Sequence, residues 1–170
     1  MLPSVILKLS HNTHNNKNLE TRSSMEIERK FLIHTLPKDL ETYPRKEITQ
    51  GYISTNPVIR IRRSNDDYIL TCKGKGLMER EEFELPLTAE SFAHLKTKVD
   101  GTFIEKTRYL IPYDKNLTIE LDVFHGKLAP LVLAEVEFDS TEEANAFLPP
   151  AWFGEDVTHS SKYHNSTLSQ

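Results

Sequence analysis

Several features that mark other classes of protein are scarce or missing in this chain of 170 residues. The single cysteine, Cys72, cannot form an internal disulfide, which fits a reducing, cytoplasmic compartment and favours a buried structural thiol. No run of about 20 apolar residues is present, which excludes a transmembrane helix. The net charge of −4 argues against general binding to nucleic acid or to a membrane surface. Neither a P-loop nor a zinc-type Cys or His spacing occurs. These absences favour a soluble globular protein.

Residues 1–24 differ in composition from the rest of the chain. A short apolar stretch at Val5–Leu7 precedes an Asn- and His-rich run, without the basic region or cleavage site of a signal peptide. We expect a disordered extension over residues 1–24 and one domain over residues 25–170. Met25 directly precedes the first patterned strand, so it is an alternative start of the native chain.

Eight segments alternate between polar and apolar residues, which is typical of β-strands. They are residues 25–33, 48–54, 58–64, 68–73, 80–87, 102–113, 117–125 and 131–139. Helical spacing occurs over residues 88–99, with Thr88 as N-cap, and over a segment from Ser140 to Phe147 that opens with a capping box. The polar tail from Thr158 onward is a candidate for one more short helix. The pattern predicts a mainly β domain of the α+β class.

Six of these strands carry charged residues two positions apart, and residues i and i+2 of a strand point to the same face. The sets are Glu26/Glu28/Lys30, Arg60/Arg62, Glu82/Glu84, Lys106/Arg108, Glu120/Asp122 and Glu135/Glu137. One alternative is an ordinary half-buried sheet whose charged face meets water. Adjacent like charges such as Arg60 and Arg62 gain nothing on an open face. We therefore predict an eight-stranded antiparallel β-barrel tunnel with a polar lumen and an apolar exterior, flanked by a few helices.

The charges that such a lumen would bring together suit two kinds of ligand. Paired carboxylates suit hard divalent cations, and Arg or Lys pairs suit phosphate oxygens. A lumen that holds both indicates a metal–polyphosphate site. The alternative is a set of internal salt bridges without a ligand.

An ordered set of motifs resembles the CYTH superfamily, the triphosphate tunnel metalloenzymes, and is most similar to short bacterial inorganic tripolyphosphatases. The resemblance covers roughly residues 25–168. The motifs are Glu26-Ile27-Glu28-Arg29-Lys30, Arg60-Ile61-Arg62, Thr71-Cys72-Lys73-Gly74, Glu82-Phe83-Glu84, Glu105–Tyr109, Glu120-Leu121-Asp122 and Glu135-Val136-Glu137-Phe138.

The resemblance implies a role for each matching position. Metal ligands for Mg²⁺ or Mn²⁺ would be Glu26, Glu28, Asp122, Glu135 and Glu137. Phosphate-binding residues would be Lys30, Arg60, Arg62, Lys73, Lys106 and Arg108, with Lys162 as the basic residue that closes the tunnel from the C-terminal segment. Lys30, Glu82 and Glu84 are the candidate catalytic residues, the two glutamates as groups that orient or deprotonate the attacking water.

The implied activity is metal-dependent hydrolysis of inorganic tripolyphosphate, a small-molecule substrate. Three alternatives stay open on the sequence: a class IV adenylyl cyclase, a nucleoside or thiamine triphosphatase, and a non-catalytic polyphosphate-binding module. The sequence predicts neither the oligomeric state nor the choice between Mg²⁺ and Mn²⁺.

Overall fold

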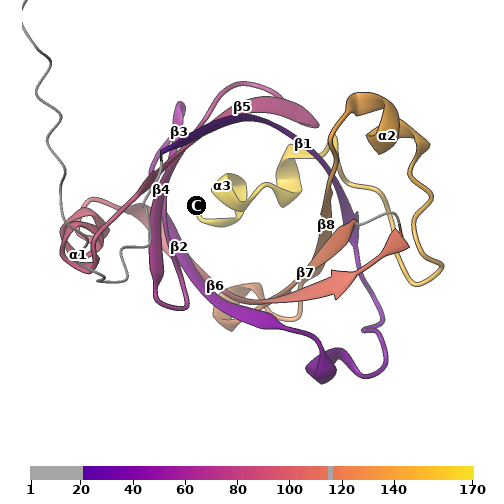
Figure 1. The fold of residues 1–170 in the computed structure, drawn as a ribbon. Helices are drawn as coiled ribbons and strands as arrows, with labels where there is room; N and C mark the ends of the chain where they lie inside the picture. The colour runs from indigo at the N-terminus through magenta and orange to yellow at the C-terminus, as the bar shows by residue number, and fades with distance from the viewer. Residues whose placement is uncertain (1–20, 115–116) are drawn as a thin grey trace, which may run out of the picture.

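The computed structural model describes residues 21–114 and 117–170, and its strands close into one barrel (Figure 1). The order around the barrel is β1-β5-β4-β3-β2-β6-β7-β8, and every neighbouring pair is antiparallel. The strands are β1 (Arg22–Leu32), β2 (Arg45–Thr55), β3 (Val58–Ser64), β4 (Asp67–Lys73), β5 (Glu79–Pro86), β6 (Asp100–Pro112), β7 (Thr118–Phe124) and β8 (Val132–Glu137). The predicted eight-stranded antiparallel barrel is confirmed.

Helices are few and short, as the sequence predicts. They are α1 (Ala89–Lys96), α2 (Thr141–Ala146) and α3 (Asn165–Leu168), with 3-10 turns η1 (Leu40–Thr42), η3 (Gly126–Leu128) and η4 (Ser161–Tyr163). Both predicted N-caps form, since Thr88 Oγ1 accepts a hydrogen bond from the Ser91 amide and Ser140 Oγ accepts one from the Glu143 amide. No helix of the described residues is long and apolar enough to cross a membrane.

The main apolar core lies outside the barrel, between the strands and the segments that cover them. Outward side chains of β1, such as Ile27 and Phe31, belong to a buried cluster with Phe147, which follows α2. The Phe31 ring centroid lies 6.0 Å from that of Phe147 and 4.8 Å from that of Phe153. Because the apolar faces are buried outside, the charged faces of the same strands point into the lumen.

A second apolar cluster occupies one end of the lumen. Ile104, Phe124 and Leu133 continue the inward faces of β6, β7 and β8, and they pack with Tyr163 and Leu168 of the C-terminal segment. In Figure 1, α3 lies within the outline of the barrel. The lumen is therefore apolar at this end and charged over the remainder of its length.

Some boundaries differ from the predicted ones. β1 begins at Arg22, because Arg22 to Ser24 already pair with β5, whereas the predicted strand begins at Met25. Helix α1 ends at Lys96, before the predicted end at Val99. Residues 1–20 of the predicted extension lie outside the described residues. Cys72 is free and only partly buried.

Candidate active site

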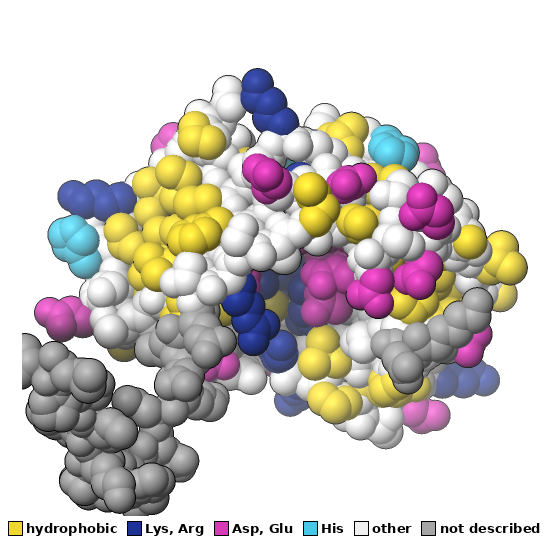
Figure 2. Space-filling model, turned by 45° about the horizontal axis from the view of Figure 1, so that its top comes forward, with side chains coloured by type: hydrophobic (Ala, Val, Ile, Leu, Met, Phe, Trp, Pro, Cys, Tyr) yellow, Lys and Arg dark blue, Asp and Glu magenta, His cyan; other side chains and the backbone are white. Residues whose placement is uncertain are grey.

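A charged cavity of about 260 Å³ fills the polar part of the lumen. In the space-filling view its opening has Lys and Arg side chains on one side and Asp and Glu side chains on the other (Figure 2). The strand order explains this separation, because β3, which carries Arg60 and Arg62, lies four positions around the barrel from β8, which carries Glu135 and Glu137. The cavity thus has a basic wall and an acidic wall.

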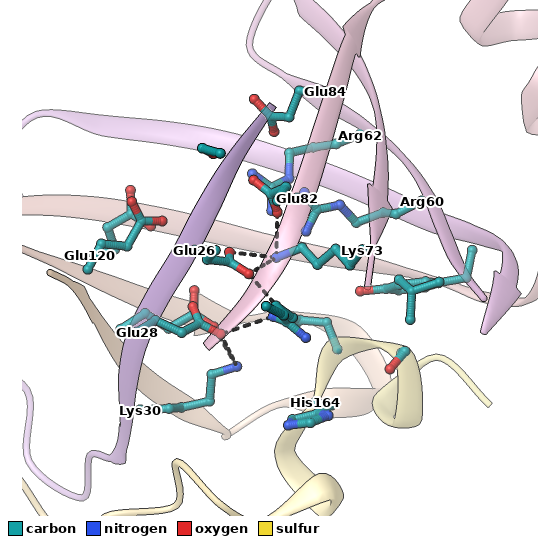
Figure 3. Close-up of a pocket in the computed structure, with 18 of the residues that line it drawn as sticks. Glu26, Glu28, Lys30, Arg60, Arg62, Lys73, Glu82, Glu84, Glu120 and His164 are labelled. Carbon is teal, nitrogen blue, oxygen red and sulfur yellow. Dashed lines mark hydrogen bonds and ion pairs between the residues drawn. The ribbon is translucent and has the colours of Figure 1, made fainter. Parts of the chain in front are cut away.

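Eleven of the predicted site residues line this cavity. They are Glu26, Glu28, Lys30, Arg60, Arg62, Lys73, Glu82, Glu84, Arg108, Glu135 and Glu137. Figure 3 shows how Glu26, Glu28 and Lys30 succeed one another along β1, with Lys73 between Glu26 and Glu82. Strand alternation puts these residues on one face, and barrel closure brings the faces together.

Most charges in the lumen form one continuous chain of ion pairs across six strands, here named the ion-pair chain. In order, its members are Lys106, Asp122, Arg108, Glu135, Lys30, Glu28, Arg80, Glu26, Lys73 and Glu82, with successive charged atoms 2.5 to 3.7 Å apart. Five members are basic and five are acidic, and Glu120 joins the chain as a sixth carboxylate through its ion pair with Arg108. The internal salt bridges considered from the sequence therefore exist, and they coexist with an open cavity.

The ion pairs control the protonation of the buried carboxylates. Burial opposes ionisation of Glu26, but Lys73 and Arg80 lower the pKa of its carboxyl to about 2. Burial also opposes ionisation of Glu135, yet Lys30 and Arg108 hold its pKa well below the ordinary value. Burial raises the pKa of Glu28 despite the opposing effect of Lys30, and Glu135 and Glu26 contribute in the same direction as burial.

Arg60 and Arg62 are the cavity cations of β3 that the ion-pair chain leaves out. Arg60 donates to Thr71 Oγ1 at 2.9 Å and Arg62 donates to Gln50 Oε1 at 3.2 Å, both neutral acceptors. Among the described residues, the buried Nε of Arg60 has no hydrogen-bond partner. Burial, Arg60 and Arg108 lower the pKa of Arg62 to about 10. These two guanidinium groups supply positive charge that an anionic ligand would neutralise.

On the opposite wall, Glu137 is crowded by other carboxylates. Burial, together with Glu120, Glu26, Glu28 and Glu135, raises the pKa of its carboxyl to about 7. Glu120 accepts a hydrogen bond from Arg108, whereas no ion pair to Glu137 forms within the described part of the chain. The acidic wall therefore has excess negative charge that a cation would neutralise.

The raised pKa of Glu137 predicts how the stability of the metal-free protein changes with pH. The folded carboxyl holds its proton up to about pH 7, above the ordinary value of 4.5, so its contribution is complete below pH 4.5 and is lost as the pH rises through 7. Glu137→Gln removes this loss. We expect urea unfolding to give equal stabilities for wild type and Glu137→Gln near pH 4.5, and a higher stability for Glu137→Gln than for wild type at pH 8. Glu142→Gln, at an exposed position on α2, is the control, and parallel curves for Glu137→Gln and wild type would contradict the assignment.

Lys106 and Asp122 do not line the cavity, although both were predicted to contact ligands. Their side chains are fully buried, and Lys106 Nζ lies 2.5 Å from Asp122 Oδ2. Arg108 binds both oxygens of Asp122 at 2.6 Å and also donates to Glu135 at 2.5 Å. Asp122 thus contacts the cavity only through Arg108, because two cations already occupy its oxygens.

This buried arrangement predicts a large effect on stability. Asp122→Asn leaves the Lys106 ammonium buried without a carboxylate, so we expect a loss of about 3–5 kcal/mol in the free energy of unfolding by urea. Adding Lys106→Met should recover part of it, since the thioether chain can pack on Phe124, whose ring centroid lies 5.3 Å from Lys106 Nζ. Asp66→Asn, in an exposed turn, serves as control. If the stability losses of Asp122→Asn and Lys106→Met simply add in the double variant, the two side chains do not interact and the predicted Lys106–Asp122 ion pair is contradicted.

The C-terminal segment contributes to the cavity at a different residue from the predicted one. Lys162 is exposed, lies 5.1 Å from the ring centroid of its neighbour Tyr163 and does not line the cavity. His164 and Asn165 line it instead. Burial, followed by Lys30 and Arg80, lowers the pKa of His164 to about 4, so its imidazole is neutral at pH 7.

Sequence reasoning missed Arg80 and Arg22 as cavity residues, whereas Glu120 lines the cavity as its charged pair with Asp122 predicted. Arg80 continues the alternation of Glu82 and Glu84, and Arg22 continues that of β1, so the two-residue period could have identified both. Glu120 was recognised as charged, but only its neighbour Asp122 was given a role. No signal in the sequence distinguishes His164 from the other histidines.

The acidic residues do not form a metal site on their own. Across residues 21–114 and 117–170, no three His, Cys, Asp or Glu side chains converge closely enough to hold a metal ion. The carboxylates of Glu26, Glu28 and Glu135 face Lys and Arg side chains instead. A cation at this site would need further ligands beyond these side chains.

Comparison with known proteins identifies relatives over most of the chain. The CYTH domain matches residues 24–169. The chain is 41% identical over 148 residues to an inorganic triphosphatase of Nitrosomonas europaea, a match that covers 85% of this chain and 96% of that protein. It is 35% identical over 150 residues to an inorganic triphosphatase of Acetivibrio thermocellus, covering 84% of this chain and 92% of the relative.

Solved structures agree with these matches. A crystal structure of an inorganic triphosphatase aligns with a TM-score of 0.63 at 39% identity, covering 85% of this chain and 93% of the other. A putative adenylyl cyclase from Hippeastrum, described as having a dominant triphosphatase activity, aligns with a TM-score of 0.54 at 14% identity over 71% of this chain and 83% of the other. The second likeness shows the fold alone. On the extent of the domain match and the identity of its relatives, the chain belongs to the CYTH domain family.

Proposed function

We propose that this protein hydrolyses inorganic tripolyphosphate in the barrel cavity, with Mg²⁺ or Mn²⁺ as cofactor. The observation that carries the proposal is the opposition of two charged walls: Arg60 and Arg62 face a wall of carboxylates that includes Glu135 and Glu137. Relatives with 41% and 35% identity that are named inorganic triphosphatases support it.

The basic wall suits the phosphates of the substrate. A triphosphate carries about four negative charges near neutral pH, and guanidinium groups bind phosphate oxygens through paired hydrogen bonds. Arg60 and Arg62 supply donors that no carboxylate of the described residues occupies. Lys73 lies on the adjacent strand β4, and Lys30 and Arg108 line the same cavity next to Glu135. We assign these five residues to phosphate binding.

The acidic wall suits a divalent cation that binds together with the substrate. Mg²⁺ usually keeps several waters and takes one or two carboxylates plus substrate phosphates, so it needs no complete cage of side chains. Glu137 fits this role because burial and the neighbouring carboxylates raise its pKa and no ion pair to it forms among the described residues. Glu26, Glu28 and Glu135 line the same cavity. When bound, the ion would act as a Lewis acid on phosphate oxygens. Asp122 and Lys106 are assigned a supporting role beneath the cavity.

The reaction itself requires mainly positioning and neutralisation of charge. Water attacks a terminal phosphorus, the bond from that phosphorus to the bridging oxygen breaks, and orthophosphate and pyrophosphate leave. Glu82 and Glu84 line the cavity beside Lys73 and are the candidates to orient the water and accept its proton. Lys30, held 2.8 Å from Glu135, stabilises the charge on the transferred group.

Phosphate release from tripolyphosphate, ATP and pyrophosphate, with Mg²⁺, with Mn²⁺ and with chelator, tests the proposal. We expect metal-dependent release that favours tripolyphosphate. Faster release from ATP would indicate a nucleoside triphosphatase, and cyclic AMP without phosphate would indicate a cyclase. Tight binding of tripolyphosphate without turnover under either metal would indicate a binding module. Each of these three results would overturn the proposed substrate or reaction.

A further inference from the structure

Arg80 occupies the carboxylates that the proposed function assigns to the cation. Its Nε lies 2.7 Å from Glu26 Oε2 and its terminal nitrogen lies 3.1 Å from Glu28 Oε1. The register explains this, because Arg80 on β5 is directly opposite Glu26 on β1, and Glu28 follows two residues later on the same face. One guanidinium therefore bridges two successive inward carboxylates.

Both carboxylate oxygens of Glu26 already accept hydrogen bonds from cationic side chains. Lys73 Nζ lies 2.6 Å from its Oε1 and 2.7 Å from its Oε2, in addition to the contact with Arg80. The side chains of Arg80 and Glu26 are 13% and 9% exposed, so water weakens these pairs little. A divalent cation that binds Glu26 and Glu28 must displace Arg80, since two positive centres repel at this distance.

We propose that Arg80 is an exchange residue: it neutralises Glu26 and Glu28 in the empty cavity and transfers to a phosphate oxygen when a divalent cation takes these carboxylates. Arg80 lines the cavity, so a triphosphate there lies within reach of its guanidinium. The cation frees Arg80 for the triphosphate, and the triphosphate draws Arg80 away from the carboxylates. Each ligand thus prepares the site of the other.

Such an exchange makes the two affinities interdependent. By thermodynamic linkage, the factor by which metal tightens triphosphate binding equals the factor by which triphosphate tightens metal binding. In the exchange, Arg80 and the cation never face the same carboxylates together, so their mutual repulsion is avoided.

Titration of the metal-free protein with Mn²⁺ alone tests the proposal, with Arg80→Gln as the variant. Because the competitor is gone, we expect Arg80→Gln to bind Mn²⁺ about tenfold more tightly than wild type, within the usual range of coupling between sites. The matched control is Arg62→Gln, which removes a cation from the same cavity that contacts neither Glu26 nor Glu28. Its Mn²⁺ affinity should change much less.

A second titration measures the coupling itself. Wild type and Arg80→Gln are each titrated with imidotriphosphate, in which NH replaces the bridging oxygens, in the presence and in the absence of Mg²⁺. Chelation of Mg²⁺ by the analogue is common to both, so a smaller metal effect in Arg80→Gln reports the exchange. Equal Mn²⁺ affinities for wild type and Arg80→Gln, or an equal gain in Arg62→Gln, would overturn the proposal.

Thermal melting establishes first that the variants are folded. If Arg80→Gln does not fold, Arg80→Lys replaces it, because lysine keeps the charge but cannot bridge both carboxylates. We expect Arg80→Lys to show an intermediate gain in Mn²⁺ affinity, and the absence of any gain would overturn the exchange.

The proposal rests on the proposed function for the identity of its ligands. The Mn²⁺ titration needs no hydrolysis, so a protein inactive on tripolyphosphate could still show the exchange, and an active one could lack it.

Discussion

Replacing Glu28 with glutamine is expected to lower the rate of tripolyphosphate hydrolysis by about 10³-fold, since a metal ion supplies several kcal/mol of charge stabilisation and each ~1.4 kcal/mol is tenfold in rate. The amide keeps the size of the side chain but removes the charge. Glu28 lines the cavity, is 7% exposed and lies between Arg80 and Lys30. Steady-state phosphate release with Mg²⁺ measures the effect.

Glu81→Gln is the matched control for this prediction. Glu81 lies on β5 between Arg80 and Glu82 in sequence, but it is exposed and does not line the cavity. We expect this variant to retain wild-type activity. A Glu28→Gln protein that is folded, as judged by thermal melting, and hydrolyses tripolyphosphate at the wild-type rate would remove Glu28 from the set of metal ligands.

Replacing Arg62 with alanine should lower kcat/KM for tripolyphosphate by about 10²-fold, corresponding to roughly 3 kcal/mol for a buried charge-assisted contact. Arg62 contributes a guanidinium that no carboxylate of the described residues neutralises, so its main partner would be the substrate. The effect should appear largely in KM, because the contact forms in the bound substrate as well as in the transition state.

Arg63→Ala provides the comparison for Arg62 at the next position of the same strand. Arg63 points outward, is exposed and donates to the carbonyl of Asn65. Its removal should leave kcat/KM within about twofold of wild type, because an exposed contact of this kind contributes little. Similar losses in the two variants would indicate a general charge effect and contradict a direct contact with Arg62.

The local sequence pattern was sufficient to predict the strands and most of the residues that line the cavity. The alternation of Glu26, Glu28 and Lys30 with Ile27 and Phe31 assigns one face to charge and the other to the core, and the barrel keeps that assignment. Such a pattern depends only on residues adjacent in sequence, so it can be read without the fold. The same two-residue strand period, applied to the neighbouring positions, would also have predicted Arg80 and Arg22 as cavity residues.

The pattern could not distinguish a residue that lines the cavity from one buried beneath it. Lys106 and Arg108 share a face of β6, yet only Arg108 lines the cavity. The difference comes from depth along the barrel, where Phe124 and the C-terminal segment fill the lumen below Lys106. Depth is set by the stagger of eight strands, which no single strand encodes.

The sequence by itself determined the class of the fold, the inward position of the charged residues and the family to which they belong, because each follows from a two-residue period or from motifs in a fixed order. The tertiary structure alone decided which charges neutralise each other. Arg80 and Glu26 are 54 positions apart, and Arg108 and Glu135 are 27 apart. Ion pairs depend on distances of a few ångströms across a closed barrel, and only the register of its strands sets these distances.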